Sequence, residues 1–308
     1  MRAAGVDRIG AAIRPLELPE PRPPQVGEVL LEVRACGIGN WDEFVRTGGW
    51  DTGARPPMAL GVEAAGLVGA VGAGVRDLRP GDAVTTHSLP AGSWAERFIA
   101  RADHVAPVPA VVPMTVAAAL PVPALTAAQV IDDALRVQAG QTVLVNGAGG
   151  VTGGMLVQLA AHRGAAVIAT AGAESAGRVA AMGAGTVIDY RHADWPAQVR
   201  ALTGGGVDAA ANAARSGSCQ AVTAVRDGGR LATITADLPA AERGISMLAV
   251  QVVPDGGRLS ALVQLLAQGA LTVAVGERFG LGQGAAALAR ARQGAHGTAI
   301  VFAPRGPV

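Results

Sequence analysis

Three glycines near the middle of the chain have a spacing that suits the binding of a phosphate group. Gly147, Gly150 and Gly153 follow an apolar run at 143–145 and precede a breaker-free stretch at 154–160. One glycine lets the chain turn off a strand, one lets backbone approach a pyrophosphate, and one lets a helix pack on the strand. The anion then binds at the helix N-terminus. We predict that the contacts to a dinucleotide cofactor come from Gly147, Gly149, Gly150, Val151, Thr152 and Gly153.

The context of this glycine turn makes the prediction specific. A chain with 43 glycines can match such a spacing by chance. Here a strand-like run precedes the turn, a helix-like run follows it, and a second apolar run arrives at 165–169. Together they form a βαβ unit of about 30 residues, which is the setting in which the motif binds a dinucleotide.

The elements around the turn divide the chain into two kinds of structure. Residues 1–113 alternate short β-like runs with Gly/Pro turns, which predicts a small β-rich domain. From residue 114 the pattern becomes α/β, which predicts a doubly wound parallel sheet with helices on both faces. The expected elements are helices at 114–137 and 257–268, strands at 186–189, 207–211 and 230–234, and a β-like run at 271–275. We expect domains at 1–113 with 276–308, and at 114–275.

Composition excludes several classes of function. The net charge of +1, without a basic run, argues against a nucleic-acid partner. Cys36 and Cys219 are too far apart for a paired-cysteine motif, so we expect both in the core and no structural zinc site. The start of the chain has no long apolar segment, which favours a cytoplasmic protein. Residues 104–131 contain no charge, but their prolines argue against a membrane span, and we interpret them as a buried interdomain connector.

Taken in order, these motifs resemble the zinc-independent medium-chain dehydrogenase/reductase superfamily, in its quinone oxidoreductase (zeta-crystallin-like) branch. The matching segments are residues 35–38 with Asp42 and Arg46, 61–66, 80–84, 92–96, 118–121 with 125–127, the glycine turn, and 228–231. The resemblance covers nearly the whole chain. It implies a GroES-like catalytic domain built from both chain ends, an inserted Rossmann domain, and an active site in the cleft.

The resemblance also implies an enzyme that works without metal. Zinc-dependent relatives carry cysteine and histidine where this chain has Gly39 and Asn40, and a second histidine where it has Val62. Glycine and valine have no group that coordinates Zn²⁺. Hydride transfer to an electrophilic quinone or enone needs no Lewis acid, so we expect reduction rather than alcohol oxidation.

The second strand of the βαβ unit bears on the choice of cofactor. NAD enzymes place Asp or Glu about 20 residues past the first glycine, whereas residues 169–172 here are small and uncharged. This favours NADPH, with Glu174 as a feature that could instead favour an unphosphorylated ribose. The resemblance assigns further cofactor contacts to Thr126, Ser175, Arg178 and Tyr190. Ser175 replaces a common lysine, so Arg178 is a candidate partner of the 2′-phosphate.

The candidate catalytic residues are Asn40, Asp42 and His87, and the candidate substrate-pocket residues are Trp41, Phe44, Arg46 and Trp94. Many relatives use an asparagine and a tyrosine here, but this chain has Gly39 and Phe44, so it lacks the phenolic acid. Asp42 and Arg46 are spaced for a helical ion pair, which is our default interpretation. His87, on a loop, could protonate the product. Without such an acid, the proton can come from water.

Three functions therefore remain open. The first is an NADPH-dependent reductase of quinones or α,β-unsaturated carbonyl compounds that acts on a small molecule. The second is an enoyl reductase acting on a carrier-bound thioester, and the third is a non-catalytic NADPH-binding protein. The resemblance also implies a homodimer, and the apolar run at 247–253 predicts that its strands pair at a sheet edge.

Overall fold

The structure, a computed structural model, describes residues 1–294 and 296–304 and separates into two compact units. The first comprises Met1–Val122 with Pro254–Val308, and the second comprises Pro123–Val253. Residues 295 and 305–308, which belong to the predicted 276–308 segment, lie outside the described residues. No described helix has the length and apolar character needed to cross a membrane.

The first unit is built mainly from antiparallel strands. Its main sheet has the order β15-β16-β3-β5-β6-β8, with β7 also paired to β3, and a small sheet has the order β2-β1-β4. The strands are β1 (Arg2–Val6), β2 (Arg14–Glu17), β3 (Glu28–Ile38), β4 (Met58–Ala59), β5 (Glu63–Val71), β6 (Ala83–His87), β7 (Arg97–Arg101), β8 (Val105–Pro107), β15 (Val275–Phe279) and β16 (Ala299–Phe302). Alternate residues of β3 are buried, as expected for a strand with one face on a core.

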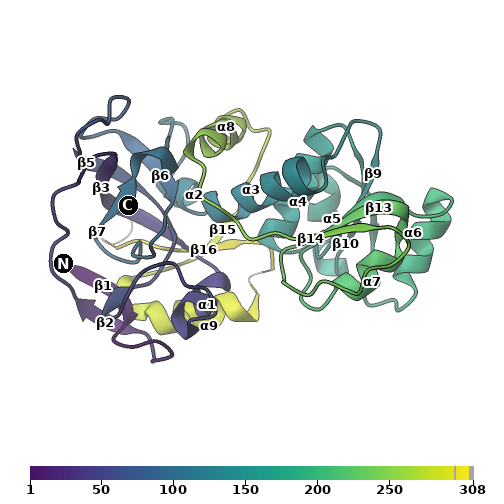
Figure 1. The fold of residues 1–308 in the computed structure, drawn as a ribbon, viewed down its shortest axis with the longest axis horizontal. Helices are drawn as coiled ribbons and strands as arrows, with labels where there is room; N and C mark the ends of the chain where they lie inside the picture. Colours follow the sequence, from purple (N-terminus) through teal and green to yellow (C-terminus); the bar gives the residue numbers. More distant parts are fainter. Residues whose placement is uncertain (295, 305–308) are drawn as a thin grey trace. The chain divides into compact units, whose positions relative to one another are not determined.

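Short helices complete this unit. They are α1 (Trp41–Thr47), η1 (Ala102–His104), α2 (Met114–Ala118), α8 (Gly256–Ala267), η3 (Leu281–Gln283) and α9 (Gly284–Gln293). The C-terminal elements α9 and β16, yellow in Figure 1, join the purple N-terminal strands, and β16 pairs directly with β3. Both ends of the chain therefore build one unit.

The second unit is a parallel sheet with the strand order β11-β10-β9-β12-β13-β14. Its strands are β9 (Thr142–Asn146), β10 (Ala166–Thr170), β11 (Ala184–Ile188), β12 (Val207–Asn212), β13 (Val225–Thr233) and β14 (Ser246–Ala249). Its helices are α3 (Pro121–Ala128, which begins in the first unit), a π-helix η2 (Gln129–Ala134), α4 (Val151–His162), α5 (Ala173–Ala181), α6 (Trp195–Thr203) and α7 (Ser218–Thr223). The chain thus has the predicted doubly wound α/β fold in one unit and the predicted GroES-like β-rich fold in the other.

Apolar side chains fill the sheet faces of the second unit. Leu144, Ile168 and Leu231 come from three strands and pack with Trp195 and Val199 of α6. Helix α4 buries eight consecutive residues, from Gly153 to Ala160. Because burial of one large apolar side chain contributes about 1.5–3 kcal/mol, this core holds the carboxyl ends of the strands in place.

The division between the units differs from the predicted one. The boundaries fall at 122/123 and 253/254, instead of 113/114 and 275/276. Helix α2 belongs to the first unit because its alanines pack against Ala35 and Ala65 of the sheet. Helix α8 also belongs there, since Gly256 at its N-terminus packs closely on the carbonyl group of Asp103.

Three local expectations need correction. The predicted helix at 114–137 is three elements, because Pro121 starts a new helix and a π-helix follows it. The strand expected at 271–275 begins only at Val275. Cys36 is buried as predicted, but Cys219 is exposed on α7.

Candidate functional site

The glycine turn of the second unit has little room for side chains at two positions. Gly147 follows β9 with a φ of +84°, and a Cβ atom there would lie 2.7 Å from the Ala214 nitrogen. A Cβ atom on Gly153 would lie only 2.1 Å from the Gly147 carbonyl oxygen. These two glycines therefore allow the turn itself and the close packing of α4 on it.

The remaining glycines of the turn leave its outer surface open. A Cβ atom on Gly150 would lie 3.8 Å from the Gly147 carbonyl oxygen, and one on Gly149 would make ordinary contact with Ser175. Gly150 is the N-cap of the 12-residue helix α4, and no side chain caps that N-terminus. Backbone N–H groups that side chains leave accessible, at the N-terminus of a long helix without a side-chain cap, can bind a pyrophosphate.

An arginine lies against this turn. Arg178, on α5, donates from Nη2 to the Gly149 carbonyl oxygen at 2.8 Å and contacts Ser175 Oγ at 3.4 Å. The structure therefore brings together three sequence-predicted residues: Gly149, Ser175 and Arg178. A guanidinium at the start of α4 adds positive charge where the second strand, β10, ends in the uncharged Thr170.

The other predicted cofactor residues lie around the same unit. Thr126 is buried on α3. Tyr190 follows β11, is 53% exposed, and has the Arg191 guanidinium 5.9 Å from its ring centre. Glu174 is in the first turn of α5, where its carboxylate lies over Gly172 and contacts Arg191 at 3.5 Å. The carboxylate of Glu174 thus already has a cationic partner.

In the first unit, the predicted Asp42–Arg46 ion pair is wrong. Arg46 instead pairs with Glu43, with Nε 2.6 Å from Oε2, and donates to the carbonyl oxygens of Gly10 and Ala11. Asp42 is fully buried, and its Oδ2 accepts a hydrogen bond from the Gly39 nitrogen at 2.9 Å. Helical spacing did not distinguish the buried carboxyl from the partly exposed one.

The buried environment of Asp42 changes its acidity. Burial raises the pKa of Asp42 to about 8, although the hydrogen bond from Gly39 opposes the rise. The Oδ1 atom of Asp42 is buried without a hydrogen-bond partner among the described residues. At neutral pH the carboxyl group is therefore largely protonated.

A second buried carboxyl group, which the sequence analysis did not single out, lies nearby. Glu63 Oε2 accepts a hydrogen bond from the Val122 nitrogen at 2.8 Å, and its Oε1 lies so close to Gly37 that a Cβ atom would be 2.1 Å away. Burial raises the pKa of Glu63 well above its ordinary value, although the hydrogen bond from Val122 opposes the rise. The sequence feature that could have indicated Glu63 was its position at the start of β5, within the 61–66 motif.

His87 lies at the end of β6 rather than on a loop. It is fully buried, its Nδ1 is 2.9 Å from the Val62 carbonyl oxygen, and its ring centre is 6.2 Å from that of Trp50. Because a carbonyl oxygen only accepts, Nδ1 carries the proton in this contact.

The candidate pocket aromatics occupy different environments. Trp94 is fully buried, donates from Nε1 to the Gly37 carbonyl oxygen at 3.2 Å, and packs edge-on against Phe302. It is therefore a core residue, which corrects its assignment to a substrate pocket. Phe44 is 52% exposed on α1. Trp41, also on α1, lays its indole ring against Gly39, and Asn40 precedes the helix as an exposed residue that makes no side-chain cap.

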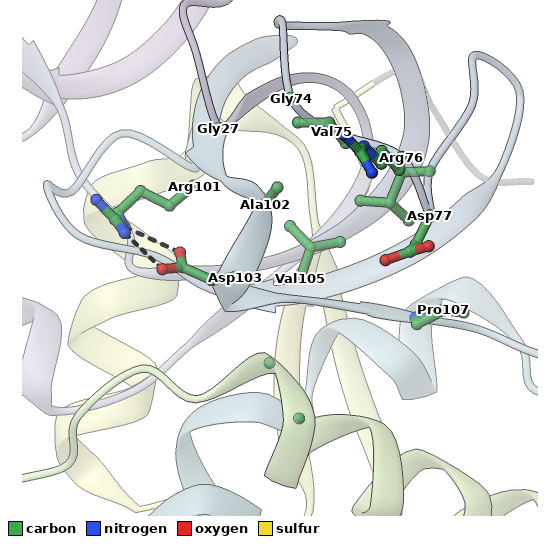
Figure 2. A pocket seen from close by; sticks show the side chains of 13 residues that line it. Gly27, Gly74, Val75, Arg76, Asp77, Arg101, Ala102, Asp103, Val105 and Pro107 are labelled. Atoms are coloured by element: carbon green, nitrogen blue, oxygen red, sulfur yellow. Dashed lines mark hydrogen bonds and ion pairs between the residues drawn. The ribbon is translucent and has the colours of Figure 1, made fainter.

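A separate surface pocket lies at the far end of β3 from these residues. It has a volume of about 440 Å³ and includes Gly27, Gly74 and the first residues of α8 in its lining. Figure 2 shows Arg101 and Asp103 hydrogen-bonded to each other at its edge. None of the sequence-predicted site residues lines it, so this pocket is distinct from both candidate sites.

The described residues contain no group of three or more His, Cys, Asp or Glu side chains arranged to hold a metal ion. At the positions where the sequence analysis looked for zinc ligands, Val62 is buried and Gly39 lies under the Trp41 ring.

Two domain families match the chain. Residues 25–110 match the alcohol dehydrogenase GroES-like domain, and residues 151–258 match the zinc-binding dehydrogenase domain. Quinone oxidoreductase from Mus musculus is 31% identical over 182 residues, which are 59% of this chain and 55% of the mouse protein. The chain thus matches just over half the length of this curated relative.

Solved structures match over nearly the full length. A mycobacterial quinone oxidoreductase is 30% identical with a TM-score of 0.83, covering 99% of this chain and 100% of that one. A mycobacterial protein in complex with NADPH is 29% identical with a TM-score of 0.85 and the same coverage. An NAD-dependent alcohol dehydrogenase is also 29% identical, with a TM-score of 0.86, covering 98% of this chain and 99% of that one.

Proposed function

Because this chain belongs to the medium-chain dehydrogenase/reductase superfamily, in its quinone oxidoreductase branch, we propose that it is an NADPH-dependent reductase. Its substrates would be small quinones or α,β-unsaturated carbonyl compounds, reduced without a metal ion. The observation that carries the proposal is the glycine turn. Its backbone is not covered by side chains, no side chain caps the N-terminus of α4, and Arg178 is hydrogen-bonded to the turn, so that the turn fits the phosphates of a dinucleotide. The mycobacterial relative in complex with NADPH supports the choice of cofactor.

The residues of the second unit would hold the cofactor. The turn from Gly147 to Gly153 would bind the pyrophosphate through backbone N–H groups. Arg178 and Ser175 would bind the 2′-phosphate, with Tyr190 against the adenosine ribose and Thr126 near the nicotinamide. When bound, the reduced nicotinamide would supply a hydride to the substrate.

The residues of the first unit would handle the substrate. Trp41 and Phe44 offer apolar surface for a flat ring. Asn40, Asp42 and His87 are the candidates for hydrogen bonding to the substrate or for proton transfer. Asp42 is the stronger proton source of the two buried groups, because its protonated carboxyl can donate whereas the Nδ1–H group of His87 already donates to the Val62 carbonyl oxygen.

A turnover assay tests the proposed reaction. Purified protein is mixed with NADPH or NADH and a panel of quinones and enones, and the absorbance of the reduced nicotinamide is followed against a control without protein. We expect the protein to consume NADPH faster than NADH. Tight NADPH binding without turnover on any member of the panel would instead favour a carrier-bound thioester substrate or a non-catalytic role.

Arg178 gives a direct test of cofactor choice. Replacing it with glutamine removes the positive charge next to Gly149, so we expect the Kd for NADPH to rise about tenfold while that for NADH changes little. Titration of both reduced cofactors by fluorescence measures the two constants. Arg191→Gln is the matched control, since Arg191 pairs with Asp189 and Glu174 instead of the turn. An equal rise in the Kd values for NADPH and NADH would contradict the proposal that Arg178 binds the 2′-phosphate.

We also propose that the chain forms a homodimer through β14. This strand is at one edge of the parallel sheet, and Leu248 on it and Val253 just beyond it are exposed. An unpaired edge strand with apolar side chains favours pairing with a second strand. Light scattering of the purified protein should give twice the monomer mass, and the monomer mass alone would contradict the proposal.

A further inference from the structure

A continuous chain of hydrogen bonds runs along the carboxyl ends of the central strands in the second unit. Gly147 donates to Thr170 Oγ1 at 3.0 Å, and this hydroxyl donates to Asn146 Oδ1 at 2.6 Å. Asn146 Nδ2 then donates to Asn212 Oδ1 at 2.8 Å. Asn146 and Asn212 are both buried, so the glycine turn after β9 is linked through side chains to the end of β12.

The chain of hydrogen bonds ends at one carboxylate. Asn212 Nδ2 lies 2.9 to 3.1 Å from the hydroxyl oxygens of Ser218, Thr233 and Thr235. Each of these three hydroxyl groups in turn lies 2.6 to 2.8 Å from Asp237 Oδ1. The Ser218 nitrogen donates to the other oxygen, Oδ2, at 3.1 Å. We call Asn212, Ser218, Thr233 and Thr235 the Asp237 cradle.

The cradle keeps Asp237 ionised. Partial burial acts to raise the pKa of Asp237, but the hydrogen bonds donated by Thr235, Ser218 and Thr233 outweigh it and hold the pKa at about 2. Within residues 1–294 and 296–304, the groups that contact this carboxylate include no arginine or lysine. Asp237 therefore carries a negative charge at every physiological pH, and its charge is stabilised by neutral dipoles rather than cancelled by a cation.

Both loops that hold Asp237 contain a strained residue. Ser216, just before α7, has a φ of +56°, and Ala236, next to Asp237, has a φ of +56°. Neither is glycine, so each left-handed conformation is energetically unfavourable. Non-glycine residues keep such conformations where the surroundings enforce them, and they gather at ligand-binding loops.

The sheet topology indicates which part of a dinucleotide would approach this carboxylate. The strand order reverses beside β9, and a doubly wound sheet binds each mononucleotide half over one set of three strands. The adenosine half would lie over β9 to β11, where Arg178 and Tyr190 are found. The nicotinamide half would then lie over β12 to β14. Asp237 follows β13, at the carboxyl ends of that second set.

We propose that Asp237 is a fixed negative charge beside the nicotinamide ring that favours the positively charged, oxidised ring over the neutral, reduced one. This inference rests on the proposed function, because it requires a dinucleotide on the glycine turn. A charge that is already oriented stabilises the positive charge as it develops on the ring when hydride leaves. Asp237 is then a specificity-determining residue for the redox state of the cofactor.

The test compares the affinities for the two redox states of one cofactor. NADP⁺ and NADPH share the same phosphates and riboses, so the ratio of their Kd values reports the charge on the ring. Isothermal calorimetry on the full chain measures both constants. In Asp237→Asn we expect the ratio of Kd for NADP⁺ to Kd for NADPH to rise about tenfold. Asp237→Glu, which keeps the charge, should restore the ratio to within about twofold of the original.

Three further variants separate the effect of the charge at Asp237 from that of the total charge and from that of stability. Asp227→Asn removes the same charge at the opposite end of β13, where Asp227 is exposed and pairs with Arg243, so the ratio should not change. Leu238→Lys adds a cation next to Asp237 without touching the cradle, because Leu238 is 45% exposed. We expect it to raise the ratio about threefold, whereas Leu202→Lys, on a 62% exposed residue of α6, should leave it unchanged.

The outcomes distinguish this inference from the proposed function. If neither cofactor form bound the original protein, both would be overturned. If both forms bound, and Asp237→Asn and Leu238→Lys left the ratio unchanged, only the role of Asp237 would be overturned. Should Asp237→Asn fail to fold, the Leu238→Lys and Leu202→Lys pair alone decides, since neither replaces a cradle residue.

Discussion

Replacing Gly153 with alanine should weaken NADPH binding by more than about tenfold and lower the free energy of unfolding by about 1–3 kcal/mol. The new Cβ atom would lie 2.1 Å from the Gly147 carbonyl oxygen and 2.9 Å from the Ala148 Cα. Both atoms belong to the backbone of the turn, so the clash cannot be relieved by rotating a side chain. The turn would move, and its N–H groups would no longer converge on one anion.

Gly177 provides the matched control for this change. It also lies inside a helix, α5, but a Cβ atom there meets nothing within 4 Å. Gly177→Ala should therefore raise the free energy of unfolding by about 0.5–1 kcal/mol, as expected for alanine replacing glycine in a helix. Chemical denaturation and fluorescence titration of both variants measure the two effects. Unchanged NADPH affinity in Gly153→Ala would show that the turn does not bind the pyrophosphate as proposed.

The second large effect is expected at Asp42, and it depends on pH. The folded state raises the pKa of this carboxyl from 3.8 to about 8. The folded state therefore binds more protons between these values, so stability falls as the pH rises through this window. The stability that Asp42 contributes is fully present below pH 4 and is lost by pH 8.

Asp42→Asn should remove this dependence. The amide keeps an acceptor for the Gly39 nitrogen but cannot ionise, so at pH 8 the variant should be more stable by on the order of 5 kcal/mol. The gain should shrink to nearly zero at pH 4. Urea denaturation at several pH values measures it, with the exposed Asp51→Asn as the control. A gain that is independent of pH would contradict the raised pKa.

The sequence predicted those features that depend on residues close together in the chain. The glycine turn and the parallel strands were predictable because backbone geometry and the period of apolar residues act over a few neighbours. Asp42 and Arg46 have the right helical spacing, yet Arg46 pairs with Glu43, because burial in the folded unit determined which carboxylate it could reach. Spacing carries no information on burial.

Contacts between distant segments account for the other differences. Helix α8 was expected with the doubly wound sheet, but it joins the first unit because Gly256 packs on Asp103, about 150 residues away in sequence. Trp94 was expected in a pocket, but its partners Gly37 and Phe302 come from opposite ends of the chain. The role of Asp237 depends on hydrogen bonds from Thr233 and Thr235 just before it and from Ser218 at the start of α7. Such residues acquire their roles only when the sheets assemble.

The packing of Trp41 on Gly39 also restricts how this protein can change over evolutionary time. A Cβ atom on Gly39 would lie 2.3 Å from the indole ring. A residue with a side chain at position 39 therefore fits only if the Trp41 ring takes another position. We expect positions 39 and 41 to change together rather than one at a time.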